Sequence, residues 1–166
     1  MQRAVFFDRD GVINREMGDY VTQKEDFHLL PDAIDCIKLA HKNGFKVILI
    51  TNQGGIDKKL YDEKILNEIH QVLINECVKN GTTIDDIFYC RHHPTIGNCL
   101  CRKPNSLMLE KAIAKYHLNP SHCIMIGDHQ RDIDAALKAG VLGLLVQPNK
   151  PKLHLLNEQI NALLSK

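Results

Sequence analysis

Short apolar runs alternate along the chain with longer stretches in which apolar residues recur every three or four positions. Short runs of apolar and β-branched residues are typical of strands that are buried on both faces of a parallel sheet. They predict strands over residues 4–7, 46–50, 87–89, 123–126 and 142–146. Strands that alternate with helices favour an α/β fold, here a Rossmann-like three-layer sandwich with a mainly parallel central sheet.

Five stretches with helical periodicity fill the gaps between these strands and follow the last one. Pro31 and Asp32 mark the start of the first helix and Gly44 its end, because proline suits the first turn of a helix and glycine the residue after the last turn. Asp62 and Gly81 bound the second helix in the same way. The other three helices are expected over residues 106–116, 130–139 and 152–164.

The chain shows no sign of a division into parts. It has 166 residues, 44% of them hydrophobic, which is enough to fill one hydrophobic core. No linker rich in proline, glycine or serine and no repeat interrupts it. We therefore expect a single domain over residues 1–166. No insertion after Asp10 or after Thr51 is long enough for a cap domain, so the ligand site should be open.

The charge of the chain is nearly balanced, with 21 Lys and Arg against 20 Asp and Glu. A formal charge of +1 provides no one-signed field for nucleic acid or for an anionic membrane, so small ligands are the expected partners. The first apolar run is broken by Asp8 and is too short for a signal peptide or a membrane-spanning helix. We expect a cytoplasmic protein that acts as a monomer.

Two acidic residues directly follow the first predicted strand, in the order Asp8, Arg9, Asp10, Gly11. Ligands of parallel sheets bind beyond the carboxyl ends of the strands, and Gly11 lets the backbone turn there. One carboxylate can then attack phosphorus while the other handles the proton of the leaving group and of the attacking water. The alternative is an ordinary turn with two solvated acids.

Polar residues at three further strand ends favour the first interpretation. Thr51 offers a hydroxyl to a phosphate, and Lys103 offers a compact cation, while Arg102 can hold a second anionic or hydroxyl group. Asp128 supplies a hard oxygen ligand for Mg²⁺, and Asp132 follows one helical turn later. Each residue alone could be a cap or a turn, but together they predict a phosphoryl-transfer site.

A cluster of metal-binding residues precedes Arg102. Three of the six cysteines and two histidines lie within residues 90–101, and in a reducing compartment such clustering points to metal or to catalysis. Thiolate and imidazole together favour tetrahedral Zn²⁺ in a closed, structural site. The predicted ligands are Cys90, His92, Cys99 and Cys101. It stays open whether His93 is the ligand in place of His92. The alternative without a metal is a set of free thiols or one redox pair.

These residues together resemble a known family. Asp8-x-Asp10, Thr51, Lys103 and Gly127-Asp128 with Asp132 are similar to the four motifs of the haloacid dehalogenase (HAD) superfamily of phosphatases, and the match spans roughly residues 4–145. The resemblance implies that Asp8 is the nucleophile and Asp10 the acid and base. Thr51 and Lys103 would hold the phosphoryl group. Mg²⁺ would be bound by Asp8, the backbone carbonyl of Asp10, and Asp128.

The cysteine-rich loop within this framework resembles one subgroup, the D-glycero-D-manno-heptose 1,7-bisphosphate 7-phosphatases and the related histidinol-phosphate phosphatases. The segment over residues 16–21 is similar to the heptose enzymes, although Asp19 is inserted. This resemblance implies removal of the 7-phosphate of the sugar bisphosphate through an aspartyl-phosphate. The implied substrate-binding residues are Glu16, Gly18, Tyr20, Asn52, Gln53, Arg102 and His129. Histidinol phosphate remains an alternative substrate, and an inactive zinc-stabilised binding domain a third possibility.

The chain departs from the subgroup at several positions around the predicted substrate site. Gly54 stands where a serine is usual, and Lys58 and Lys59 replace an arginine and a glycine. The lysine that often follows the late aspartate is His129 here. The orientation of the substrate is therefore open, with Arg102 and either Lys58 or Lys59 predicted to hold the end of the substrate that does not react.

Overall fold

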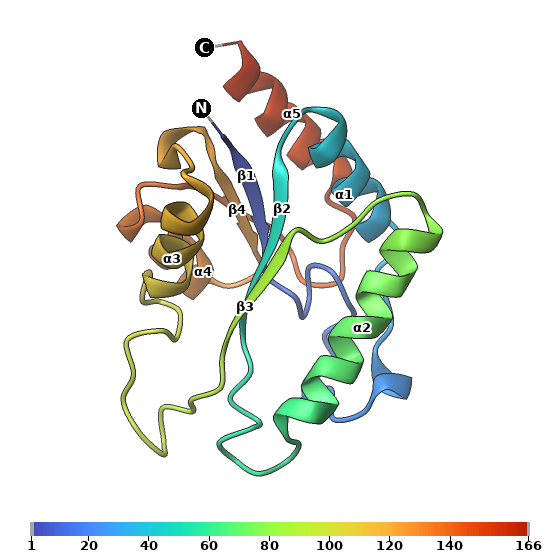
Figure 1. The fold of residues 1–166 in the computed structure, drawn as a ribbon, viewed down its shortest axis with the longest axis vertical. Coiled ribbons are helices and arrows are strands. Elements are labelled where there is room, and N and C mark those ends of the chain that lie inside the picture. Colours follow the sequence, from blue (N-terminus) through green and yellow to red (C-terminus); the bar gives the residue numbers. More distant parts are fainter. Residues whose placement is uncertain (1, 166) are drawn as a thin grey trace.

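The computed structural model describes residues 2–165 and contains one parallel sheet (Figure 1). Its strand order is β3-β2-β1-β4-β5, and every pair of neighbouring strands runs parallel. The strands are β1 (Ala4–Phe7), β2 (Lys46–Asn52), β3 (Asp86–Cys90), β4 (Ile124–Gly127) and β5 (Leu142–Leu145). This arrangement confirms the predicted α/β sandwich with its parallel central sheet.

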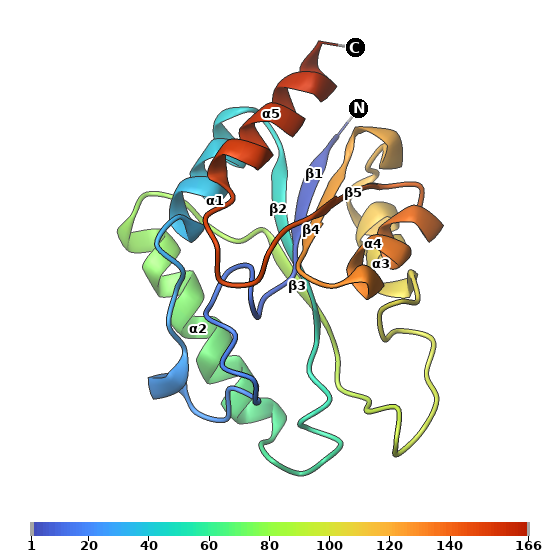
Figure 2. The same ribbon diagram turned by 180° about the vertical axis from the view of Figure 1, so that it is seen from behind.

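Helices cover both faces of the sheet (Figures 1 and 2). They are α1 (Ala33–Lys42), α2 (Glu63–Lys79), α3 (Leu107–Tyr116), α4 (Gln130–Lys138) and α5 (Leu153–Leu164). Helices α1, α2 and α5 lie on one face and α3 and α4 on the other, which completes the three layers. Asp62 caps α2 as expected, since its carboxylate accepts a hydrogen bond of 2.9 Å from the backbone N–H of Ile65.

The core consists of two apolar layers, one on each face of the sheet. In β1, Val5 and Phe7 pack with the cluster under α1 and α5, whereas Ala4 and Phe6 pack with the cluster under α3 and α4. All four side chains are fully buried. Burial on both faces is the reason that this strand is continuously apolar rather than alternating.

The second strand is longer than its apolar run predicts. It continues past residue 50, because Thr51 and Asn52 still pair with Tyr89 and Cys90 of β3. Two polar side chains are thus fixed by the sheet itself instead of by a loop. The strand end therefore holds Thr51 and Asn52 rigidly beside the segment that follows β1.

The connections after β1, β2, β3 and β4 gather at one edge of the sheet, opposite the edge near both termini (Figure 1). Within residues 2–165 the segments 8–32 and 53–62 carry no α-helix and no strand, only a 3₁₀ turn at Lys24–Asp26 and isolated β-bridges, so no cap domain covers this edge. None of the described helices is both long and apolar enough to cross a membrane. The carboxyl edge of the sheet is thus open for a site.

Candidate active site

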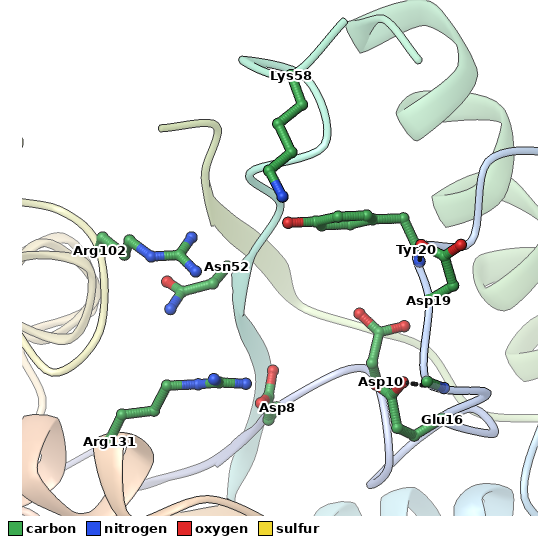
Figure 3. Close-up of a pocket in the computed structure, with 10 residues that line it drawn as sticks. Asp8, Asp10, Glu16, Asp19, Tyr20, Asn52, Lys58, Arg102 and Arg131 are labelled. Atoms are coloured by element: carbon green, nitrogen blue, oxygen red, sulfur yellow. Dashed lines mark hydrogen bonds between the residues drawn. The ribbon is translucent and has the colours of Figure 1, made fainter. Parts of the chain in front are cut away.

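A cavity of about 410 Å³ opens at the carboxyl edge of the sheet (Figure 3). Its lining residues are Asp8, Asp10, Glu16, Gly18, Asp19, Tyr20, Asn52, Lys58, Arg102 and Arg131. Seven of them were predicted as site residues from the sequence. Lys58 was predicted as an alternative to Lys59. Five other predicted residues, namely Thr51, Gln53, Lys103, Asp128 and His129, lie outside this lining.

The cavity has walls of opposite charge. Figure 3 shows Arg102 and Arg131 on one side, and the carboxylates of Asp10 and Asp19 on the other. The ammonium group of Lys58 lies 5.4 Å from the centre of the Tyr20 ring, within the range of a cation–π contact. A molecule with phosphate and hydroxyl groups matches both walls, since guanidinium groups bind phosphate and carboxylates accept from hydroxyls.

Asp8 lies in the cavity with its charge only partly compensated. Its Oδ1 accepts a hydrogen bond of 2.7 Å from the backbone N–H of Arg9 and lies 2.9 Å from the ammonium nitrogen of Lys103. Burial raises the pKa of Asp8 to about 7, with Lys103 opposing the shift and the nearby Asp132 adding to it. The ionised nucleophile would therefore be stabilised by one more positive charge in this position.

Lys103 is buried beneath Asp8. Its ammonium group donates a 2.8 Å hydrogen bond to the carbonyl of Ile50 and lies 2.7 Å from Asp132 Oδ1 as well as 2.9 Å from Asp8. The amide of Asn52 fixes the Lys103 backbone through two hydrogen bonds, one donated and one accepted. Lys103 thus links the nucleophile to the end of β2 and to the first turn of α4.

Asp10 has the opposite environment. Arg9 forms an ion pair of 2.9 Å with its Oδ1, and Asn14 and Gln53 each donate a hydrogen bond of 3.0 Å to its carboxylate. Burial alone would raise the pKa of Asp10, but the guanidinium group and these donors outweigh it and lower the pKa. Arg9 is itself buried and was not predicted as a site residue, although its place between two aspartates was a signal.

Gln53 is a buried link rather than a lining residue. Its Nε2 donates to Asp10 Oδ2 at 3.0 Å and to Thr51 Oγ1 at 2.9 Å, while its Oε1 accepts a 2.6 Å hydrogen bond from the hydroxyl of Tyr61. Thr51 is equally buried. The structure therefore places Gln53 where it orients Asp10 and Thr51.

Asp128 contributes an oxygen without a partner. Its Oδ1 lies 2.7 Å from His129 Nδ1, but its buried Oδ2 has no hydrogen-bond partner. Gly11 makes room for it, since any side chain at Gly11, whose φ is 79°, would collide with Asp128 Oδ2. A hydrogen bond of 2.9 Å from the N–H of Asp8 to Ile126 joins the two strand ends that carry the aspartates. His129 is held by Asp128 and does not line the cavity.

The oxygen donors at these strand ends fit Mg²⁺. Asp8 Oδ2 has no hydrogen bond within the described residues, and Asp128 Oδ2 is the buried, unpartnered oxygen. Carboxylate oxygens are the ligands that this hard cation prefers. A cation here would compensate the two carboxylates that Lys103 and His129 leave partly unpaired.

The predicted zinc ligands come together in the loop between β3 and α3. One ligand atom from each of Cys90, His92, Cys99 and Cys101 lies within 4.8 Å of all the others. The S···S distances of 3.0 to 3.6 Å are shorter than the ~3.8 Å edge of a tetrahedron with Zn–S bonds of about 2.3 Å, so the three thiols lie close enough to share one ion. His93 points elsewhere, with its Nδ1 2.8 Å from Thr95 Oγ1. Burial and the neighbouring thiol of Cys101 raise the pKa of Cys90 well above its ordinary value, so three thiolates would need a cation.

Asn149 is a further residue that sequence reasoning missed. Its backbone N–H donates a 2.9 Å hydrogen bond to the carbonyl of Gly11, and its side chain accepts from the N–H of Glu16 at 2.7 Å and donates to the Glu16 carbonyl at 2.8 Å. Asn149 has a φ of 60°, a conformation that asparagine tolerates better than most residues. The turn after β5 thereby holds the loop that carries Glu16 and Tyr20 against the nucleophile loop.

The chain is similar to proteins of known family along most of its length. The HAD-hydrolase-like family model matches residues 100–162. A D-glycero-beta-D-manno-heptose-1,7-bisphosphate 7-phosphatase of Helicobacter pylori is 38% identical over 90% of this chain and 86% of its own length. A D-glycero-alpha-D-manno-heptose-1,7-bisphosphate 7-phosphatase of Photorhabdus laumondii is 37% identical over 84% of this chain and 79% of its own.

A solved structure of the same family has the same fold. The D,D-heptose 1,7-bisphosphate phosphatase of B. bronchiseptica, complexed with magnesium and phosphate, superposes with a TM-score of 0.86 at 30% identity and covers 99% of both chains. Relatives of this identity and coverage share their family as well as their fold. The chain therefore belongs to the heptose-1,7-bisphosphate 7-phosphatase family of the HAD hydrolase superfamily.

Proposed function

We propose that the chain is a magnesium-dependent phosphatase that removes the 7-phosphate of D-glycero-D-manno-heptose 1,7-bisphosphate through an aspartyl-phosphate on Asp8. The observation that carries this proposal is the cavity in which Asp8 and Asp10 lie opposite two guanidinium groups. Family membership supports the sugar bisphosphate as the substrate class.

Asp8 attacks phosphorus in the first step. Lys103 lies 2.9 Å from Asp8 Oδ1 and holds the carboxylate in place for the attack. Mg²⁺, held by Asp8, Asp128 and the backbone carbonyl of Asp10, would supply the positive charge that offsets repulsion between the carboxylate and the phosphate. The raised pKa of Asp8, about 7, shows why such a charge matters for the ionised form.

Asp10 moves the proton in both steps. Its lowered pKa keeps it ionised in the free chain, the form that takes a proton from the water that attacks the aspartyl-phosphate. A phosphate dianion bound beside Asp8 would raise the pKa of Asp10 by like-charge repulsion, toward the protonated form that the leaving alkoxide needs. Gln53 and Arg9 orient the carboxylate for this exchange.

The remaining lining residues fit the rest of the sugar bisphosphate. Arg102 and Lys58 are the cations at the end of the cavity away from Asp8 (Figure 3), and we assign them to the phosphate that stays on the product. Tyr20 and the carboxylates of Glu16 and Asp19 then face the sugar hydroxyls. We also propose that the chain acts as a monomer in the cytoplasm.

We also propose that Cys90, His92, Cys99 and Cys101 bind one structural Zn²⁺. The guanidinium group of Arg102 donates a 3.0 Å hydrogen bond to the carbonyl of His92, so an ordered loop positions Arg102 directly. Four protein ligands leave no open position for water, and the ion would act through the backbone rather than in the chemistry.

Histidinol phosphate is the second candidate substrate. The observation in its favour is the pair of carboxylates, Glu16 and Asp19, in the cavity lining, because a carboxylate can bind the ammonium group of an amino alcohol. The three cations of the lining, Lys58, Arg102 and Arg131, favour a substrate with two phosphates instead.

The test is a substrate panel with the purified chain and saturating Mg²⁺. It contains both anomers of the heptose bisphosphate, histidinol phosphate and an aryl phosphate. We expect Mg²⁺-dependent phosphate release, with the highest kcat/KM on a heptose bisphosphate and the 1-phosphate as product. A higher kcat/KM on histidinol phosphate would overturn the assignment of the substrate. If no compound released phosphate, the proposed activity would be wrong.

A further inference from the structure

Arg131 is a cation of the cavity that none of the family motifs identifies in this sequence. It lies in the first turn of α4, one residue before Asp132, and its side chain lines the cavity. Figure 3 shows its guanidinium group pointing toward Asp8. The arginine therefore reaches the place where phosphorus would lie during the attack.

The guanidinium group has no partner among the described residues. Its Nε is buried and makes no hydrogen bond, and no carboxylate forms an ion pair with it. The other arginines of the site are engaged, since Arg9 pairs with Asp10 and Arg102 donates to the carbonyl of His92. A buried donor without an acceptor is unfavourable unless a ligand satisfies it.

The other cation near the nucleophile is already surrounded. Three oxygen atoms, from Ile50, Asp8 and Asp132, lie within 2.9 Å of the Lys103 ammonium nitrogen. An ammonium group has three donors, so little of this charge is left for a phosphoryl oxygen. His129, the residue of the α4 start that was predicted to contact substrate, is held by Asp128 outside the cavity lining.

We propose that Arg131 is a further catalytic residue whose guanidinium group binds the oxygens of the phosphoryl group that Asp8 attacks. A guanidinium group matches two phosphate oxygens at once, and that of Arg131 points toward Asp8 (Figure 3). Its contacts strengthen as negative charge spreads over the equatorial oxygens of the transition state. This inference rests on the proposed phosphatase function and adds the residue that holds the reacting group.

Two substrates distinguish this role from a role in holding the other phosphate. An aryl monophosphate has only the reacting phosphate, whereas the heptose bisphosphate has both. If Arg131 contacts the reacting phosphate, its loss lowers kcat/KM by similar factors on the two substrates. A loss confined to the bisphosphate would assign Arg131 to the distal phosphate and overturn the proposal.

The experiment compares Arg131→Gln and Arg131→Lys with the original chain at saturating Mg²⁺. We expect Arg131→Gln to lower kcat/KM by about 100-fold or more on both substrates, as for loss of one preorganised donor to a transition state. Arg131→Lys should recover part of the loss. Arg91→Gln is the matched control, because Arg91 is exposed and pairs with Glu63 outside the cavity. Changes within about twofold on both substrates would refute the role.

Direct binding of inorganic phosphate in the presence of Mg²⁺ separates this inference from the proposed function. The original chain should bind phosphate at least tenfold more tightly than Arg131→Gln, about 1.4 kcal/mol, while both melt at the same temperature. Equal phosphate affinity would overturn the inference even if the original chain hydrolyses every substrate. If the original chain hydrolyses none, the activity fails, and the affinity comparison still decides whether Arg131 binds phosphate.

Discussion

Asp8 and Asp10 are two residues apart, yet their environments shift their pKa values in opposite directions. Burial raises the pKa of Asp8 to about 7, while Arg9, Asn14 and Gln53 lower that of Asp10 despite burial. Environments that separate the pKa values of two nearby acids also separate their roles. The structure thus supports a nucleophile that depends on a cation and a carboxylate that handles protons.

Asp10→Asn tests this division at the level of one residue. The amide keeps an acceptor for Arg9 but cannot carry a proton, so kcat should fall by about 10²- to 10⁴-fold. Phosphate binding should change far less. The checks are steady-state kinetics and phosphate affinity in the same buffer, and equal loss of turnover and of binding would argue against the role in proton transfer.

His70 gives a prediction about stability and pH. It is buried in α2 with its ring centre 6.2 Å from that of Tyr89, and its Nε2 has no hydrogen-bond partner. Burial, with a smaller effect of Arg9, lowers the pKa of His70 to about 3. The unfolded chain, with a pKa near 6.5, therefore binds more protons between these two values, and stability is lost as the pH falls from about 6.5 toward 3.

His70→Phe should remove this part of the pH dependence. Relative to pH 7.5, the original chain should lose about 2 kcal/mol of unfolding free energy at pH 5 that the variant keeps. Denaturant titrations at both pH values measure the difference, with the exposed His122→Gln as control. The same pH dependence in the variant and the original chain would contradict the assignment.

At the level of elements, loops from distant parts of the chain hold the substrate loop in place. The side chain of Asn149 bonds to both backbone groups of Glu16, and its own backbone bonds to Gly11. Residues more than a hundred positions apart thereby fix the entrance of the cavity. This contact depends on the turn after β5 and not on the sequence near Glu16.

Asn149→Gly keeps the positive φ that this position requires and removes both side-chain hydrogen bonds. Each lost hydrogen bond costs about 0.5 to 1 kcal/mol net. The loss of both should therefore raise the KM for the bisphosphate by about 5- to 30-fold. The value of kcat should stay within about twofold if Asn149 acts through substrate binding. The check is steady-state kinetics of this variant, with Asn75→Gly at an exposed position of α2 as the control. A fall in kcat without a change in KM would contradict the role of Asn149 in substrate binding.

The cysteine loop is the second element that shapes the cavity. Asn105 donates a 3.1 Å hydrogen bond to the carbonyl of Cys99, and Arg102 donates to that of His92, so the loop and the cationic wall are connected. Four ligands on one ion would keep these carbonyls in place.

Loss of the zinc should therefore weaken phosphate binding while the magnesium site remains. We expect one zinc per chain by metal analysis, and Cys99→Ala should lose it. At saturating Mg²⁺ this variant should show a KM for the heptose bisphosphate raised by about tenfold, because the His92 carbonyl no longer positions Arg102. Thr95→Ala, in the same loop but outside the cluster, should keep both zinc and KM. Full zinc content in Cys99→Ala would refute the ligand assignment.

At the level of the whole molecule, the hydrophobic pattern predicted the strands and helices because burial on both faces of the sheet leaves a continuous apolar signature. Ala4 to Phe7 show it without exception. The pattern also placed Asp8, Asp10 and Asn52 at one edge, since the carboxyl ends of parallel strands meet there. The predicted end of β2 at residue 50 was too early. The polar residues Thr51 and Asn52 still pair with β3 through their backbones, which the pattern of side chains does not report.

Which side chains face the cavity could not be read from the sequence. Gln53 and His129 follow strand ends as expected, yet one is held by Thr51 and Tyr61 and the other by Asp128. Arg131 reaches the cavity because α4 begins beside the end of β1. No pattern in the sequence near Arg131 indicates this packing. Such positions depend on contacts between segments far apart in the chain.

In the proposed mechanism Asp8 attacks phosphorus, and water then releases the phosphate from Asp8. Each in-line displacement inverts the configuration at phosphorus, so two successive displacements give net retention. The most direct measurement is the stereochemical course of hydrolysis, followed with a 7-thiophosphate of the heptose bisphosphate made chiral by oxygen isotopes in labelled water. We expect retention. Inversion, the result of direct attack by water on phosphorus, would rule out an aspartyl-phosphate on Asp8.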